Sequence, residues 1–333
     1  MVQDSHTSAA GRYAILVTGN LVAPLAEKYG NYADMFLKLL KDGNDETWDV
    51  YFVFEKDSPP DEVLANYECL VLTGSSADSF LNPDWNNQLR TRLAAAVKRQ
   101  QRILGICYGH QIMARVLGGE TGRASSFEGG PRTMKVTPAF FEQWFVKSDW
   151  FDKDRTEDWK FNIHETHQDV VTSMPPDVTL IASSGFTYCE AMTYKNSFLG
   201  LQGHPEFTAE FQTALIQYRL QQKTLTKQQA EESMTVLKEN PVSHADFQKV
   251  QKMLKYSFSC DENTQTAHSG ALEHVALMTT PQSAELRGHL NAQELEKGSA
   301  CLPTHSRIRI DLKAQVKIWS VTAVSLSAAA LTV

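Results

Sequence analysis

Residues 102–111 read RILGICYGHQ, and this stretch decides the fold. An apolar strand predicted over Arg102–Ile106 runs almost directly into a helix predicted over Gly109–Leu117, with Cys107 at the turn between them. Glycines lie two positions before and two positions after the cysteine, as a sharp strand-to-helix turn requires. The free N–H groups at a helix N-terminus favour a thiolate, so Cys107 is a candidate nucleophile. The pattern alone leaves a small buried core cysteine as the alternative.

Strands and helices alternate on both sides of this turn. Short apolar runs predict further strands at Tyr13–Thr18, Trp48–Phe54, Cys69–Thr73, Thr133–Thr137, Phe161–His164, Val178–Ala182 and Phe198–Gln202. Amphipathic stretches predict further helices at Tyr32–Leu40, Trp85–Gln100, Glu210–Gln222, Lys227–Glu239 and His244–Lys255. Strands that alternate with helices form a parallel sheet with both faces covered. The sequence therefore predicts an α/β fold with a mostly parallel sheet and helices on both faces.

Composition narrows the class of protein. The 333 residues carry 32 Lys plus Arg against 39 Asp plus Glu, a formal charge of −7 without a basic block, which disfavours nucleic-acid binding. The first dozen residues lack an apolar signal region and the chain has no Asn-x-Ser/Thr acceptor, so we expect a cytoplasmic protein. Five cysteines without a CxxC pair argue against a disulfide framework and a structural zinc site.

The chain divides near residue 258. Residues 259–333 contain a single aromatic residue, Trp319, so they have little to bury against the entropy of ordering. We predict a catalytic domain over 1–258 and a disordered or loosely packed tail over 259–333. Val316–Val333 is apolar but short and interrupted by polar residues, so we predict no membrane segment there.

A second motif supplies partners for Cys107. Residues 202–206, QGHPE, follow a predicted strand, and an extended segment projects His204 and Glu206 to the same side. Glu206 could then orient His204 while the other ring nitrogen faces Cys107, which is the logic of a nucleophile, a base and an orienting acid. The loop TGSS at 73–76 also follows a strand, where Gly74 can bring its N–H close to a substrate.

Together, GICYGHQ (105–111), TGSS (73–76) and QGHPEF (202–207) resemble the triad-type class I glutamine amidotransferases over about residues 13–222. Within that family the chain is similar to stand-alone members, the plant γ-glutamyl peptidases and the fungal glutamine amidotransferase-like proteins. The resemblance implies a flavodoxin-like fold. It also implies that Cys107 is the nucleophile, His204 the general acid–base and Glu206 the acid that orients it. Gly74 and Tyr108 are implied to be the two oxyanion donors.

The resemblance further implies a glutamyl pocket. Its lining residues are implied to be Gln111, the loop Phe127-Glu128-Gly129 and His167, and Asp169 and Ser183-Ser184 before Glu190 match further family positions near it. Neither a Gly-x-x-x-x-Gly-Lys-Ser/Thr nor a Ser-Gly-Gly-x-Asp pattern is present, so the sequence shows no synthetase half. His164 and His167 could form a metal pair, but no third ligand is apparent, so we predict no metal and no cofactor.

Three functions remain open from the sequence. The first is a hydrolase of γ-glutamyl amide bonds, in glutamine or in γ-glutamyl peptides such as glutathione conjugates, that works through a γ-glutamyl thioester. The second is a glutamine amidotransferase subunit that supplies ammonia to a separate synthetase partner in specialised metabolism. The third is a catalytically inactive interaction protein. The small-molecule substrate distinguishes the first two, and the intact Cys107, His204 and Glu206 argue against the third.

Overall fold

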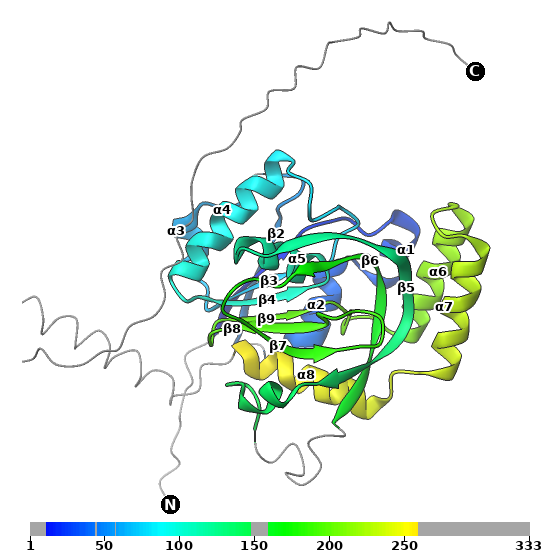
Figure 1. The fold of residues 1–333 in the computed structure, drawn as a ribbon. Helices are drawn as coiled ribbons and strands as arrows, with labels where there is room; N and C mark the ends of the chain where they lie inside the picture. The colour runs from blue at the N-terminus through cyan, green and yellow to red at the C-terminus, as the bar shows by residue number, and fades with distance from the viewer. Residues whose placement is uncertain (1–10, 44, 57, 148–158, 259–333) are drawn as a thin grey trace, which may run out of the picture. The chain divides into compact units, whose positions relative to one another are not determined.

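The computed structural model describes residues 11–43, 45–56, 58–147 and 159–258 (Figure 1). The predicted tail over 259–333, including Val316–Val333, lies outside the described residues. The described strands form one nine-stranded sheet in the order β2-β1-β3-β4-β9-β8-β7-β5-β6. None of the described helices is long and apolar enough to cross a membrane.

The sheet has a parallel half and an antiparallel half. The parallel strands are β2 (Thr47–Phe52), β1 (Arg12–Val17), β3 (Cys69–Leu72), β4 (Arg102–Ile106) and β9 (Phe198–Leu201). The antiparallel continuation consists of β8 (Ala191–Tyr194), β7 (Val178–Ser183), β5 (Glu120–Val136) and β6 (Lys160–Ser173). The predicted α/β class is confirmed, and parallel pairing is found in the half that contains the Cys107 turn.

Helices cover both faces of the parallel half. Ile15 and Val17 of β1 pack into a core with α2 (Tyr32–Leu40) and α8 (His244–Phe258). Ala14 and Leu16, which point the other way, pack with α4 (Asp84–Lys98) and α5 (Tyr108–Val116). Burial on both faces explains why these strands read as continuous apolar runs.

Local capping signals account for the helix boundaries that the sequence predicts best. Asn31 and Asp34 form a capping box at the start of α2, and Thr226 with Gln229 forms another at the start of α7 (Lys227–Glu239). Thr208 caps α6 (Ala209–Gln221) through the N–H of Phe211. The sequence analysis missed four short elements: α1 (Ala23–Tyr29), α3 (Asp61–Leu64), the 3-10 helix η1 (Pro138–Glu142) and β8.

The strands predicted at Thr133–Thr137 and Phe161–His164 are only the ends of a long ribbon. β5 and β6 pair antiparallel from Glu120 opposite Ser173 to Lys135 opposite Lys160, with a register shift between Arg123 and Glu128. Phe127-Glu128-Gly129, expected to be a loop, therefore belongs to β5. Polar residues interrupt the apolar pattern of this ribbon because one stretch of it faces the candidate site.

Candidate active site

Cys107 stands at the predicted turn between β4 and α5. Its backbone has φ 51° and ψ −102°, a conformation that a residue with a side chain adopts at a cost of about 1–3 kcal/mol. The flanking glycines allow α5 to approach the sheet closely. A Cβ at Gly105 would lie 2.6 Å from the carbonyl oxygen of Gly109, and one at Gly109 would lie 2.6 Å from Cβ of Leu72. The turn therefore requires glycine on both sides of the cysteine.

Three contacts hold the His204 side chain and its backbone after β9. The ring Nδ1 lies 2.8 Å from Oε1 of Glu206. The ring stacks on Phe207, with centroids 4.2 Å apart and planes 10° apart. The backbone N–H donates to the carbonyl oxygen of His164 at 2.7 Å, which ties this segment to β6. The imidazole is therefore oriented before any substrate arrives.

The charges around His204 favour its protonated form. Burial opposes a charge on the imidazole, but the carboxylate of Glu206 and the Cys107 side chain outweigh it and raise the pKa of His204 to about 10. The Nε2 atom makes no aligned hydrogen bond to a described residue. The Sγ atom of Cys107 accepts a hydrogen bond from Nε2 of Gln202 at 3.7 Å. An imidazolium beside the sulfur would stabilise a thiolate.

Gly74 lies against both Cys107 and His204. A Cβ at this position would be 2.9 Å from Cε1 of His204 and 3.6 Å from Cβ of Cys107. Thr18 holds the loop in place, because its hydroxyl donates to the carbonyl oxygen of Gly74 at 3.1 Å. Tyr108, the other expected oxyanion donor, directs its ring into the core, where it stacks on Trp85. Its backbone N–H, next to Cys107, is the part of Tyr108 that the expected role needs.

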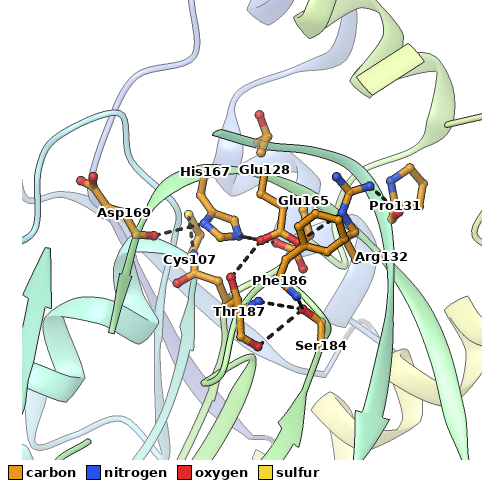
Figure 2. A network of polar contacts seen from close by, with 12 residues as sticks. Cys107, Glu128, Pro131, Arg132, Glu165, His167, Asp169, Ser184, Phe186 and Thr187 are labelled. Carbon is orange, nitrogen blue, oxygen red and sulfur yellow. Dashed lines mark hydrogen bonds and ion pairs between the residues drawn. The ribbon is translucent and has the colours of Figure 1, made fainter. Parts of the chain in front are cut away.

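A chain of polar contacts leads from Cys107 into the antiparallel half (Figure 2). Gln202, which contacts the sulfur, accepts from Nε2 of Gln111 at 3.2 Å. The same amide nitrogen of Gln111 donates to the carbonyl oxygen of Asp169 at 2.7 Å. That carbonyl also faces Nδ1 of His167 at 3.1 Å. Gln111 and His167, both expected pocket residues, are thus connected to the cysteine.

Glu128, in β5, contacts three residues on the antiparallel side of the sheet. Its Oε2 accepts from the Thr187 hydroxyl at 2.9 Å and lies 3.4 Å from Nε2 of His167. Its Oε1 is 3.2 Å from Nε of Arg132. Ser184 supports this contact by accepting hydrogen bonds from the N–H groups of Phe186 and Thr187.

Gly129, also expected in the pocket, faces elsewhere. A Cβ there would collide with Ser233, so the residue packs β5 against α7. The carboxylate of Asp169 pairs with Arg123 at 2.9 Å, which leaves its backbone carbonyl as the part that joins the network. Period-two alternation explains why Glu128 and its neighbour Gly129 point in opposite directions.

Two buried carboxylates lie beside His167; sequence reasoning missed Glu165 and named Glu190 without giving it a role. Glu165 and Glu190 are 0% and 1% exposed. Burial raises the pKa of each well above its ordinary value, and neighbouring carboxylates, Glu128 among them, raise it further. The Ser184 hydroxyl favours the ionised Glu190, but no carboxylate oxygen of either residue makes an aligned hydrogen bond to a described residue. The signal was the spacing of Glu165 and His167, which share a face once β6 is recognised as a strand.

The pair His164 and His167 does not meet. Three residues apart on β6, they project to opposite faces. His164 contacts the Gln212 side chain, and burial lowers the pKa of its ring to about 4. Cys189 is buried beside His110, with Sγ 3.8 Å from Nε2, and burial raises the pKa of its thiol to about 12. Cys69 lies in the core, as expected for a packing residue.

The comparisons with known proteins agree with this architecture. Residues 52–222 match the family described as glutamine amidotransferase class-I. The chain belongs to this family. Its sequence is 30% identical over 224 residues to γ-glutamyl peptidase 4 of Arabidopsis thaliana, covering 67% of this chain and 87% of that protein. A glutamine amidotransferase-like protein of Schizosaccharomyces pombe is 26% identical over 243 residues, covering 69% and 93%.

Solved structures share the fold at lower identity. A glutamine amidotransferase from Thermotoga maritima superposes with a TM-score of 0.51 at 18% identity, covering 76% of this chain and all of that chain. A glutamine amidotransferase from Methylobacillus flagellatus gives 0.52 at 17% identity, covering 75% and 92%. These similarities describe the fold.

Proposed function

We propose that this chain is a Cys-His-Glu hydrolase that cuts γ-glutamyl amide bonds through a γ-glutamyl thioester. The observation that carries the proposal is the His204–Glu206 pair, held at 2.8 Å next to the strained Cys107 turn. Each of these side chains is buried, so water screens their charges from one another less than it does at the surface. The names of the similar Arabidopsis proteins support the γ-glutamyl bond as the target.

In the acylation step, the sulfur of Cys107 forms a bond to the γ-carbonyl carbon of the substrate. The carbonyl oxygen takes the negative charge, and the backbone N–H groups of Gly74 and Tyr108 stabilise it; one such donor is worth about 10²–10³-fold in rate. His204 then gives its Nε2 proton to the leaving nitrogen as the C–N bond breaks. The products of this step are a thioester on Cys107 and a free amine or ammonia.

In the deacylation step, His204 takes a proton from water, whose oxygen attacks the thioester carbon. The C–S bond breaks, glutamate leaves, and the thiolate of Cys107 returns beside the protonated imidazole. Glu206 keeps the ring in one orientation and balances its charge during both steps. General acid–base help of this kind contributes about 10²–10⁴-fold.

Glu128 is the proposed recognition group for the substrate's α-ammonium. Its carboxylate is already oriented by Thr187 and Arg132, so it needs little reorganisation to pair with a cation. The network through Gln111 and Gln202 connects this side of the pocket to the sulfur. A free α-amino group on the glutamyl residue would therefore be a substrate requirement.

A glutamine amidotransferase subunit with a separate synthetase is the second candidate. Phe186 and Tyr188 are 70% and 68% exposed, and between them lies Thr187, which binds Glu128. Exposed aromatic side chains beside a buried polar network are the kind of surface that a protein partner covers. Ammonia release from glutamine that increases when a partner is added would favour this candidate.

The first experiment measures glutamate release from glutathione and from glutamine by the purified full chain. We expect turnover of a γ-glutamyl peptide by the wild type and none by Cys107→Ala, while the matched control Cys69→Ala, which removes a core thiol, keeps its activity. Turnover by Cys107→Ala close to the wild-type rate would refute the mechanism. A wild type that stays inactive on both substrates, even with thiol reductant, would favour an interaction protein.

A further inference from the structure

Glu165, His167 and Glu190 bring three metal-type ligand atoms together outside the triad. One oxygen of each carboxylate and one ring nitrogen of the histidine all lie within 4.8 Å of one another, and all three residues are buried. Nε2 of His167 is 3.2 Å from Oε2 of Glu165. Ligand atoms about 2.1 Å from a tetrahedral ion are separated by roughly 3.4 Å, which is close to this contact.

The histidine is arranged as metal ligands usually are. A ligating histidine donates its other ring N–H to a carbonyl or a carboxylate, which leaves a lone pair for the ion. Here Nδ1 faces the carbonyl oxygen of Asp169 at 3.1 Å, and a carbonyl can only accept. Nε2 points toward Glu165 and Glu128 (Figure 2), at 3.2 Å and 3.4 Å, but makes no aligned hydrogen bond to either. The contacts of Nε2 therefore fit an ion bound between the histidine and the carboxylates better than a hydrogen bond donated to one of them.

The carboxylates carry an independent indication. Both oxygens of Glu165 and both oxygens of Glu190 lack an aligned hydrogen bond within the described residues, although both residues are almost completely buried. Buried carboxylates of this kind are ordinarily paired or bound to a metal. A buried cation would satisfy these carboxylate oxygens, whose ligand atoms lie within 4.8 Å of one another and of the His167 ring nitrogen.

The charges of the neighbouring residues indicate what charge a bound cation would carry. Glu128, Glu165 and Glu190 carry three formal negative charges, and Arg132 pairs with Glu128 at 3.2 Å. The other cation that acts on Glu165 is His204, which is already paired with Glu206. With His167 as a neutral ligand, two negative charges remain. A divalent ion would neutralise the cluster.

We propose that Glu165, His167 and Glu190 bind a divalent transition-metal ion such as Zn²⁺ or Mn²⁺ in a buried structural site. The donor set of one imidazole and two carboxylates suits these ions. Glu165 and His167 belong to β6 and Glu190 directly precedes β8, the two outer strands of the antiparallel half. The ion would link these two strands through their side chains.

The test uses the full chain with Cys107→Ala, so that the thiol does not compete for the ion. After treatment with a chelator and its removal, the protein is titrated calorimetrically with Zn²⁺ and with Mn²⁺, and its Tm is measured with and without each ion. We expect saturation near one equivalent and a higher Tm with the ion. Glu190→Gln should lower the affinity about 10-fold or more, and so should His167→Asn.

The matched control is Glu142→Gln, which removes the same charge from an exposed residue and should leave affinity and Tm shift unchanged. Absence of saturable binding near one equivalent in the parent protein would overturn the proposal, and the cluster would then hold protons. Equal affinity in the parent and in a folded Glu190→Gln or His167→Asn protein would overturn it too, by placing the ion elsewhere. The parent titration decides the matter even if a variant does not fold.

Discussion

Two regions both bury a carboxylate beside a histidine, with opposite results: the region of Cys107, His204 and Glu206, and the acidic cluster of Glu128, Glu165 and Glu190. Oε1 of Glu206 is aligned with Nδ1 of His204 at 2.8 Å, and the pair raises the pKa of that imidazole to about 10. Glu165 lies at 3.2 Å from His167 without an aligned hydrogen bond, and burial raises the pKa of the carboxyl instead. The difference follows from burial and from the neighbouring charges: Glu206 and the Cys107 side chain outweigh burial at His204, whereas the carboxylate of Glu128 adds to the effect of burial at Glu165.

The residues of the two regions also come from different halves of the sheet. Cys107 and His204 follow β4 and β9 of the parallel half, at the carboxyl ends of neighbouring strands. The cluster combines Glu128 of β5, Glu165 of β6 and Glu190 before β8, all from the antiparallel half. Parallel strands place their carboxyl ends at one edge whatever their side chains, whereas the cluster depends on the register of the β5–β6 ribbon.

Breaking the aligned pair has the largest expected effect on activity. Glu206→Gln keeps the shape but removes the charge that balances the imidazolium, so we expect kcat to fall by about 10²–10⁴-fold. Steady-state kinetics on a γ-glutamyl peptide measures the change. Glu210→Gln, an exposed neighbour in α6 that pairs with Lys28, is the control and should leave kcat intact. An unchanged kcat in Glu206→Gln would remove Glu206 from the triad.

Displacing His204 without changing any charge has the next largest effect. A Cβ at Gly74 would lie 2.9 Å from Cε1 of His204, so Gly74→Ala should push the ring away from Cys107. A misplacement of about 1 Å can reduce the rate about 10²-fold, and we expect a loss of that size in kcat. Gly185→Ala is the control, because a Cβ there meets nothing within 4 Å. Near wild-type kcat in Gly74→Ala would show that the ring tolerates the shift.

On the cluster side, a change at Glu128 should affect binding more than chemistry. Glu128→Gln keeps the contact with Thr187 but removes the charge proposed to pair with the substrate's ammonium. A charge-assisted hydrogen bond contributes about 1.5–3 kcal/mol, so we expect KM to rise roughly 10-fold to 100-fold with a smaller change in kcat. Equal losses for a substrate with and without a free α-amino group would contradict the recognition role.

The smallest effect concerns stability against pH in chelator-treated protein. The folded-state pKa of Glu190 is raised above its unfolded value, so its contribution to stability is fully present below about pH 4.5 and is lost as pH rises through the folded pKa. Glu190→Gln cannot ionise, so its Tm should decline less between pH 5 and pH 8. The slope of the unfolding free energy against pH should differ between the two proteins by at most about 1.4 kcal/mol per pH unit. Identical slopes would contradict a raised pKa for Glu190, because a residue that ionises alike in the folded and unfolded protein contributes no slope.

The parts of the molecule that the sequence predicted are those decided by neighbouring residues. Capping boxes at Asn31 and Thr226 set the starts of α2 and α7, and the flanking glycines set the turn at Cys107. Such signals are hydrogen bonds and steric limits within a few positions, so they are visible before folding. The spacing of His204 and Glu206 is local in the same sense, and their 2.8 Å contact follows from it.

Tertiary structure alone decided what the antiparallel half does. Thr133–Thr137 and Phe161–His164 look like isolated short strands until each finds its partner, and the resulting ribbon turns Gly129 toward α7 and Glu165 toward His167. Glu190 joins them from 25 residues further along the chain than Glu165. A sequence can specify which residues are polar, but strand register decides which of them share a buried face. That physical difference separates the predictable turn at Cys107 from the unforeseen acidic cluster.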